Sequence, residues 1–505
     1  MTAPIRRILP AAAVAALFCS VAPQAVAQAI PTATAQPSGI SQEQALSLSA
    51  RLDALEKRNE ELEAQVADLK AQAVASSRVI REEVHSQPAV SLANGRPTFS
   101  TPDGNFKFAL RSVVQLDAAH YDVDPLRADN DLGSGLNFRR VRFGFDGTAY
   151  KDWNFALWGE WGGSGGETPA LNQAYLEYTG WKPFSFADPV RLRIGAWATP
   201  TGLEDATSNT ESLFLERAAV AELVRGFAGG DGRTGVGAFT KGERWYAGAV
   251  LTGKVVGVPS TTEFGQQSGY ILRAAFNPLH GADFDAHLGI SYQGILEPAD
   301  TAAGTTEAQA VRLQERPELR VSAVRLVDTG AITSNGLAAL GLEAGASWKN
   351  LYAAGEWFNI DVSRNTVGAV RSPFDPSFSG WYLQGAWTLT GERRAWSSAN
   401  GGFNGIRPAK PFSLQGGGLG AFELGARYSI LDLNDRAGNP GAAAPLGGIR
   451  GGEQKISTLG LNWYPNNVVR FLLDYQWINV DRLNTAGARI DSDVNVVSLR
   501  SQFAF

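Results

Sequence analysis

The side chains that suggest chemistry are three regularly spaced arginines, Arg312, Arg316 and Arg320. In an extended chain a spacing of four places all three on one face, at about 13 Å per step. Guanidinium groups suit phosphate and carboxylate oxygens, so such a file in a pore would attract small anions and pass them between sites. The alternative is a structural role, with the arginines paired to nearby carboxylates such as Glu315 and Asp328.

Residues typical of an enzyme are scarce. The chain has four histidines, none at a metal-ligand spacing, and no nucleophile motif around a serine. His287 and Ser291 lie four residues apart on the polar side of a predicted strand, a spacing that is also ordinary lumen lining. We therefore predict no catalytic residue, no metal site and no cofactor.

A hydrophobic period of two, beginning near residue 98, indicates the elements that would position the arginines. Phe106, Phe108 and Leu110 alternate with polar neighbours, and similar segments recur along the chain. These segments are 106–118, 137–148, 153–161, 170–179, 190–197, 233–240, 245–252, 268–276, 283–293, 337–348, 350–361, 378–389, 420–429, 453–464, 467–477 and 494–505. An even count of sixteen predicts an all-β fold, a 16-stranded transmembrane antiparallel β-barrel with both ends on one side of the membrane. The alternative is a soluble, secreted array of β-sandwiches.

Two connections are longer than turns. Residues 198–232 carry apolar side chains of their own, including Leu213, Phe214 and Leu215, so we expect them to fold inward against the wall as a constriction. The stretch 390–419 is long where a short turn is expected, and the period gives no account of it.

The N-terminal residues form separate segments. Residues 1–27 combine a basic start, an apolar core and a small-residue exit, Ala25-Val26-Ala27, which predicts a cleaved secretory signal. Two linkers, 28–40 and 86–97, flank the segment 41–85, and the barrel domain occupies 98–505.

Segment 41–85 has the heptad spacing of an α-helical coiled coil. Its apolar positions step by four and three residues, with charged residues beside them, and Asn59 fills one slot. These positions are Leu48, Leu52, Leu55, Leu62, Val66, Leu69 and Ala73. We predict self-association with Asn59 setting the register; the alternative is a solvated helix.

Composition narrows the class of protein. Aromatic residues make up 10% and charged residues 19% of the 505 residues, and the formal net charge is -5, which does not suggest a nucleic-acid partner. No stretch after residue 27 approaches the roughly 20 apolar residues of a membrane helix, which excludes a helical membrane protein. From residue 98 onward the chain has 28 arginines and 8 lysines, so arginine is the expected working cation. The final strand ends in Phe503 and Phe505, and such an ending fits the signal read by barrel-assembly machinery.

Several motifs in order along the chain resemble the phosphate-selective porin O and P family of Gram-negative outer membranes. Among them are Arg139-Arg140-Val141-Arg142-Phe143-Gly144, Asn172-Gln173-Ala174-Tyr175-Leu176-Glu177-Tyr178, Pro200-Thr201-Gly202-Leu203-Glu204, Phe214-Leu215-Glu216-Arg217 and Leu389-Thr390-Gly391-Glu392. The resemblance implies a homotrimer embedded in outer-membrane lipid, with the coiled coil in the periplasm. It also implies that 390–419 is the family's own long connector.

The same resemblance implies an anion-binding site. Arg139 and Arg140 would lie at the constriction, Arg217 and Ser208 would come from the inward loop, and the arginines at 312, 316 and 320 would draw phosphate inward. One departure is that loop 198–232 has no lysine and carries acidic residues, among them Glu204, Asp205, Glu211, Glu216 and Glu222.

We therefore expect an outer-membrane porin for passive diffusion of small anions, with phosphate or polyphosphate as the leading solute. The alternatives are a general or cation-leaning porin and a structural tether of the envelope.

Overall fold

The computed structural model describes residues 41–86, 88–92, 95–163, 170–183, 186–256, 265–300, 309–365 and 374–505. The predicted signal, 1–27, and the linker 28–40 lie outside the described residues. The chain divides at residues 83 and 84 into two units, which we describe separately.

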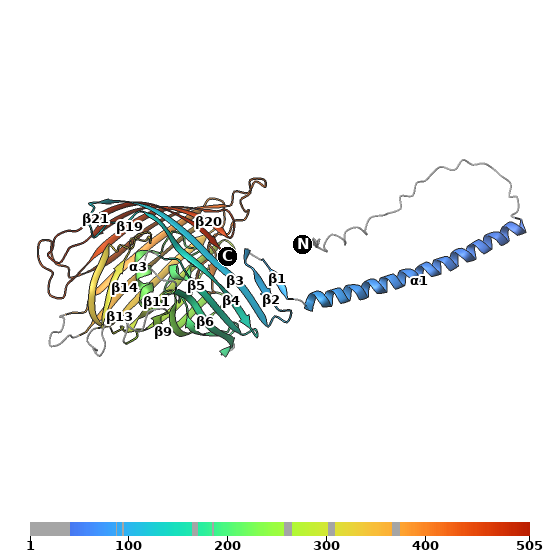
Figure 1. The fold of residues 1–505 in the computed structure, drawn as a ribbon, viewed down its shortest axis with the longest axis horizontal. Helices are drawn as coiled ribbons and strands as arrows, with labels where there is room; N and C mark the ends of the chain where they lie inside the picture. The colour runs from blue at the N-terminus through green and yellow to red at the C-terminus, as the bar shows by residue number, and fades with distance from the viewer. Residues whose placement is uncertain are drawn as a thin grey trace, which may run out of the picture. The chain divides into compact units, whose positions relative to one another are not determined.

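The first unit contains one long helix, α1 (Gln42–Ser86), drawn in blue in Figure 1. The helix predicted for 41–85 is confirmed. From residue 41 to 78 every side chain is exposed, including those at the heptad positions. No helix in the described part of the chain is long and apolar enough to cross a membrane.

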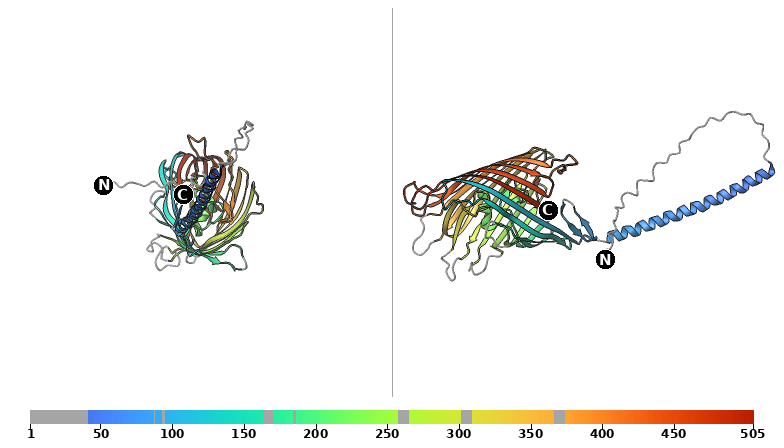
Figure 2. Two further views of the ribbon diagram at one scale, coloured as in Figure 1. Left: turned by 90° about the vertical axis from the view of Figure 1, so that its right-hand side faces the viewer. Right: turned by 45° about the horizontal axis from the view of Figure 1, so that its top comes forward.

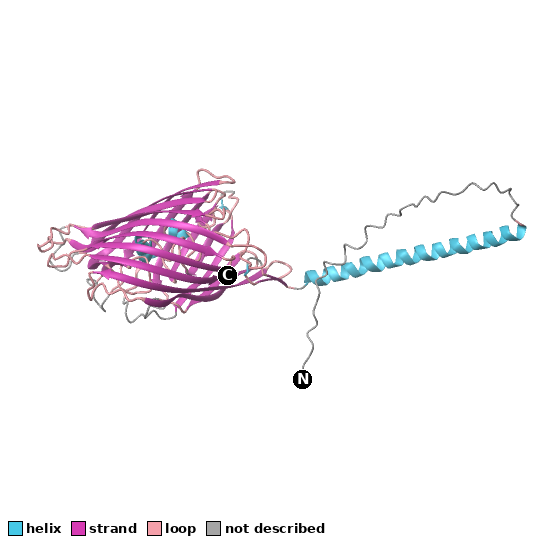
Figure 3. Cartoon of the chain, turned by 90° about the horizontal axis from the view of Figure 1, so that it is seen from above, coloured by secondary structure: helices cyan, strands magenta, loops and turns pink. Residues whose placement is uncertain are grey.

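The second unit is a closed barrel of sixteen antiparallel strands, which confirms the predicted fold. The strands are β3 (Phe106–Asp124), β4 (Gly135–Ala149), β5 (Trp153–Glu160), β6 (Ala170–Trp181), β7 (Val190–Ala196), β8 (Arg233–Lys241), β9 (Trp245–Val255), β10 (Ser268–Phe276), β11 (Phe284–Glu297), β13 (Val327–Trp348), β14 (Leu351–Arg364), β15 (Ser377–Thr388), β18 (Ala421–Asp435), β19 (Ile449–Tyr464), β20 (Val469–Asp481) and β21 (Ser492–Ala504). Each strand pairs with the next, and β21 closes the ring on β3, with Val497 opposite His120. Closure satisfies the backbone groups that a sheet edge would leave unpaired. The tilted strands surround the lumen in Figures 2 and 3.

Side-chain alternation explains why these segments line a barrel. On β14, Leu351 and Trp357 point outward and are 44% and 39% exposed, whereas Tyr352, Glu356 and Phe358 point inward and are buried. Apolar outward and polar or packed inward residues are the pattern of a membrane barrel wall.

Three short strands extend the ring. A hairpin of β1 (Ala89–Ser91) and β2 (Thr98–Ser100) pairs beside β3. Strand β12 (Ala310–Glu315) pairs with the start of β13. The chain then turns at Pro317 and Glu318, and Glu318 has a φ of 54°.

The connection between β7 and β8 folds into the lumen, as predicted. It contains α2 (Leu203–Ala206) and α3 (Ala219–Ala228), and α3 lies inside the strands in Figure 1. Leu215, Val220, Leu223 and other side chains of this segment are buried in one apolar cluster with inward residues of β11 to β21. Gly380 of β15 permits the close approach, because a Cβ there would lie 2.7 Å from Val220 Cγ2.

The long connection between β15 and β18 also folds inward. Its hairpin, β16 (Trp396–Ser397) and β17 (Gly402–Phe403), buries Trp396 and Phe403 against Leu203 and Phe214 of the β7–β8 segment. The Thr207 hydroxyl donates to the Phe403 carbonyl at 3.2 Å, and the Gly405 amide donates to Glu211 Oε2 at 3.0 Å. The two inward segments therefore fix each other within the lumen.

Candidate functional site

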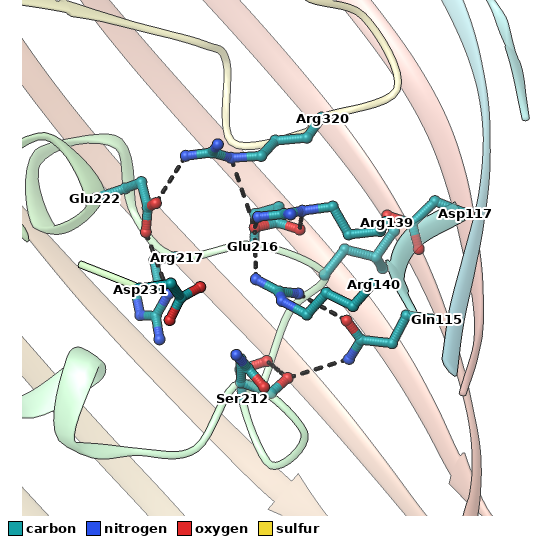
Figure 4. Close-up of polar contacts among 12 residues, drawn as sticks. Gln115, Asp117, Arg139, Arg140, Ser212, Glu216, Arg217, Glu222, Asp231 and Arg320 are labelled. Atoms are coloured by element: carbon teal, nitrogen blue, oxygen red, sulfur yellow. Dashed lines mark hydrogen bonds and ion pairs between the residues drawn. The ribbon is translucent and has the colours of Figure 1, made fainter. Parts of the chain in front are cut away.

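Glu216, on the inward β7–β8 segment, lies at the centre of an arginine cluster (Figure 4). Arg139 Nε of β4 donates to Glu216 Oε1 at 2.7 Å, and Arg140 Nη2 lies 3.6 Å from Oε2. Arg500 of β21 reaches the same carboxylate at 2.7 Å and also holds Asp117 at 2.6 Å. Burial alone would raise the pKa of Glu216, but these arginines outweigh it and hold the pKa well below its ordinary value. The Glu216 carboxylate is therefore ionised at neutral pH.

A second carboxylate, Glu222 of α3, extends the cluster. Arg320 Nη2 donates to Glu222 Oε1 at 2.7 Å, and Arg217 Nη1 donates to Oε2 at 3.2 Å. Burial alone would raise the pKa of Glu222, yet Arg320, Arg225 and Arg217 hold it at about 2.

The cluster continues to the barrel wall through alternating charges. Arg225 contacts Asp205 at 2.7 Å and Asp231 at 2.8 Å. Asp231 in turn accepts from Arg142 of β4 at 2.7 Å, and 33% of its side chain is exposed. A chain of ion pairs thus runs from β4 along the inward segment and back to β4.

The structure brings four of the predicted site residues together: Arg139, Arg140, Arg217 and Arg320 all contact Glu216 or Glu222. Ser208 is exposed, exchanges a hydrogen bond with Thr210 at 2.9 Å and lines the cavity described below.

The extended file predicted for 312, 316 and 320 is wrong. Strand β12 ends at Glu315, and the turn at Pro317 and Glu318 breaks the spacing that would hold the three arginines on one face. Arg312 pairs with Asp328 and keeps 53% of its side chain exposed. Arg316 is buried, and its carbonyl accepts from Gln454 Nε2 at 3.4 Å. Arg320 binds Glu222 and lies 4.0 Å from Glu216.

A cavity of about 590 Å³ adjoins the cluster and extends to the end of the barrel where the C-terminal Phe505 lies. Seven arginine side chains and four carboxylate side chains line it, so the side chains of the lining carry three more positive than negative charges. The arginines are Arg96, Arg111, Arg142, Arg217, Arg225, Arg407 and Arg470, and the acids are Asp146, Asp205, Glu211 and Asp231.

Two features account for much of this excess. Arg96 and Arg111 share the single carboxylate of Asp146, and Arg111 lies 3.2 Å from it. Arg470 donates to neutral backbone oxygens, those of Thr210 and Ser212, at 3.4 and 2.6 Å.

Sequence reasoning missed several members of this site. Arg142, Arg470 and Arg500 each lie on the inward face of a strand, and the period of two gives that face from the sequence. The period does not give the depth in the barrel or the partner on another segment, so it cannot distinguish these residues from other inward polar positions.

His287, which lies four residues before Ser291, has a packing role in the structure. His287 Nε2 and Glu343 Oε2 form a hydrogen bond of 2.9 Å, and Trp396 Nε1 donates to His287 Nδ1 at 3.1 Å. The ring therefore anchors the β15–β18 connection. Among the residues that the structure describes, no group of three or more His, Cys, Asp or Glu side chains could hold a metal ion.

The sequence profile of the phosphate-selective porin O and P family matches residues 107–505. The chain belongs to this family. Over 429 residues this porin is 26% identical to porin O of Pseudomonas aeruginosa, covering 80% of this chain and 90% of that one. It is 29% identical over 434 residues to an uncharacterised protein of Caulobacter vibrioides, covering 81% and 78%.

Among solved structures, this porin matches OmpT of Vibrio cholerae with a TM-score of 0.45 and 10% identity, over 79% of this chain and 98% of that one. Membership of the family, together with the closed barrel, makes the chain an outer-membrane porin, which is a channel.

Proposed function

We propose that this porin lets small anions diffuse passively across the outer membrane, with inorganic phosphate or polyphosphate as its leading solute. The observation that carries the proposal is the excess of arginines over carboxylates in the 590 Å³ cavity. Selectivity is set by the local potential, so a positive cavity favours anions although the whole chain is net negative. The Glu216 cluster, with Arg139, Arg140, Arg217 and Arg320, would form the constriction.

The acids of loop 198–232 do not oppose this proposal, because each of the six, Asp231 included, is paired with an arginine. Glu216 and Glu222 belong to the cluster already described. Glu204 lies 3.1 Å from Arg427, Asp205 lies 2.7 Å from Arg225, and Glu211 lies 3.5 Å from Arg407. Their negative charges are therefore neutralised within the protein.

The choice of phosphate rests on the chemistry of guanidinium and on the family. Arginines present forks of N–H donors that match phosphate oxygens, and the cavity offers several of them within one volume. Release requires that each site hold the ion weakly, and the carboxylates that compete for the same guanidinium groups supply that weakening.

Single-channel recording in planar bilayers tests the proposal. We expect a reversal potential in a KCl gradient that reports anion preference, and a chloride current that saturably decreases as phosphate is added. Anion preference without block would indicate a general anion pore, and cation preference would contradict the proposal.

The double substitution Arg96→Ala and Arg111→Ala tests the cavity directly. A unit charge 4 Å away contributes about 1 kcal/mol in water, so removing two should lower the anion-to-cation permeability ratio by up to about thirtyfold. Arg312→Ala is the control, because Arg312 lies outside the cavity lining on its exposed pair with Asp328. Equal ratios in the double variant and the wild type would show that the cavity does not set selectivity.

A further inference from the structure

Asp231, at the edge of the arginine cluster (Figure 4), bridges two arginines as a small oxyanion would. Its Oδ2 accepts from Arg142 Nη2 at 2.7 Å, and its Oδ1 accepts from Arg225 Nη2 at 2.8 Å. Each carboxylate oxygen therefore serves one guanidinium group. Phosphate can also offer separate oxygens to two neighbouring guanidinium groups, whereas chloride offers a single centre. The Asp231 carboxylate thus occupies the position that a bridging phosphate would take.

The exposure of Asp231 distinguishes it from other carboxylates of the cluster. Its side chain is 33% exposed and lines the cavity of about 590 Å³, whereas those of Glu216 and Asp205 are each 4% exposed. The side chains of Arg142 and Arg225, which it bridges, are 6% and 9% exposed. Asp231 is therefore far more accessible to an ion in the cavity than Glu216 or Asp205.

Both arginines keep other partners when Asp231 is withdrawn. Arg142 Nε also donates to Glu160 of β5, whose side chain is only 15% exposed. Arg225 Nε also donates to Asp205 Oδ1 at 2.7 Å. The two guanidinium groups would therefore hold their positions, and their surroundings would gain one net positive charge. An anion that enters the vacated bridge restores the balance.

The backbone gives Asp231 the freedom to move. The residue lies in the Gly-Gly-Asp-Gly segment 229–232, and the glycines on either side of it have φ of 95° and 67°. The amides of the first and last residues of this segment donate to the carbonyls of Arg225 and Asn172, at 3.1 and 2.9 Å. Glycine adopts positive φ without steric cost, so the segment can change conformation between these two fixed points. The carboxylate can therefore swing away from the arginines while the rest of the inward loop stays in place.

We propose that Asp231 is a tethered competitor for the permeating anion: its carboxylate leaves Arg142 and Arg225 when a phosphate bridges them and returns when the phosphate departs. The inference rests on the proposed function and adds to it the residue that sets how tightly phosphate is held. Burial alone would raise the pKa of Asp231, but Arg142 and Arg225 outweigh it and hold the pKa well below its ordinary value. The carboxylate is ionised at neutral pH, so it competes as an anion. Such competition lets the pore release the phosphate that it binds.

Phosphate block of the chloride current in planar bilayers tests the inference. Asp231→Asn keeps the shape of the side chain and removes its charge, so phosphate no longer competes with a carboxylate for the two arginines. We expect the half-blocking phosphate concentration to fall roughly fivefold or more, the effect of one unit charge at close range. Asp231→Glu retains the charge and should stay near the wild-type value. A half-blocking concentration that Asp231→Asn leaves unaltered would overturn the inference.

Glu211→Gln is the matched comparison. Glu211 lines the same cavity, its side chain is 28% exposed, and it lies 3.5 Å from Arg407. Its substitution removes the same charge from the cavity lining but leaves the Asp231 bridge occupied. We expect a smaller fall in the half-blocking phosphate concentration than for Asp231→Asn. Equal falls would show that Asp231 acts only through the general charge of the cavity, and would overturn the inference.

Arg142→Gln in the Asp231→Asn background tests whether the vacated bridge is the binding site. We expect it to reverse the gain in block, because phosphate loses one of its two guanidinium groups. Tight block that persists would place the phosphate elsewhere and overturn the inference. Absence of phosphate block from every variant, with anion preference intact, would also overturn it. Cation preference of the wild type would contradict the proposed function as well. Single-channel conductance in KCl alone verifies that each variant forms a folded channel.

Discussion

At the scale of single residues, Glu216 sets how much net positive charge its arginine cluster carries. It binds Arg139, Arg140 and Arg500 at once, and Arg320 lies 4.0 Å from its carboxylate. Glu216 is the carboxylate that Arg139 and Arg140 contact, whereas Arg500 also binds Asp117 and Arg320 also binds Glu222. One carboxylate on the inward loop therefore offsets a group of wall arginines and keeps their positions fixed.

We predict that Glu216→Gln increases anion preference, because the amide keeps the shape of the side chain but removes its charge. With about 1 kcal/mol per unit charge at 4 Å in water, the anion-to-cation permeability ratio should rise roughly fivefold. Reversal potentials in a KCl gradient measure the change. Asp328→Asn, which frees the exposed Arg312, serves as the control and should leave the ratio unaltered. A fall in the ratio for Glu216→Gln would mean that the released arginines bind anions too tightly or lose their positions.

The residue types of the site could be predicted from the sequence, but their pairings could not. Arg139, Arg140, Arg217 and Arg320 were identified through a resemblance or a spacing, and all four meet in the cluster. Arg500 was missed, since its partner Glu216 lies 284 residues away and no local pattern links them. Arg312 and Arg316 were included because a spacing of four implies one face, which holds only while the strand continues.

At the scale of elements, the lumen is shaped by two segments that enter from opposite ends of the barrel. The β7–β8 segment was predicted to fold inward because it carries its own apolar residues, and those residues are buried. The β15–β18 connection was recognised only by resemblance, since its strands β16 and β17 are too short to show a period. Its anchors, such as the bond between Trp396 and His287, are contacts between distant residues.

We predict that Gly380→Val narrows the pore. A Cβ at 380 would lie 2.7 Å from Val220 Cγ2 and 2.7 Å from the backbone oxygen of Ile430 on β18. The side chain of Val220 is the more easily displaced of the two, so we expect α3 to shift away from β15 into the lumen. Such overpacking costs about 1–3 kcal/mol of stability, so single-channel conductance should fall together with thermal stability. Gly135→Val is the matched control, since a Cβ at 135 meets nothing within 4 Å. Unchanged conductance at Gly380→Val would show that the wall yields instead of α3.

At the scale of the whole molecule, the chain consists of a helix and a barrel with separate physical requirements. The barrel satisfies its backbone groups by closing on itself, whereas the apolar side chains of the helix are exposed from residue 41 to 78. The fold of both units followed from two hydrophobic periods, two residues for the strands and seven for the helix. Neither period predicts how many copies associate, because both describe the sequence of one chain and not its contacts with other chains.

We predict that removal of residues 41–85 leaves single-channel conductance and reversal potential unaltered. The arginine cluster and the cavity are formed by residues from 96 onward, so the deletion removes no charge from the pore. If α1 plays no part in conduction, the truncated porin should keep its conductance. Cells that carry the truncated porin should then remain resistant to detergents. Detergent sensitivity with normal conductance would favour a tethering role for α1, and loss of conductance would show that the barrel depends on the helix.

The seam between β3 and β21 has a further consequence, for protein engineering. The first and last strands of the ring, β3 and β21, are hydrogen-bonded neighbours like every other adjacent pair of strands. The closed wall therefore does not depend on which strand comes first in the chain. Adjacent termini favour circular permutation. A gene that joins Phe505 to Phe106 through a short linker and opens the chain at residues 436–448 should therefore encode the same barrel with its new ends at the opposite rim.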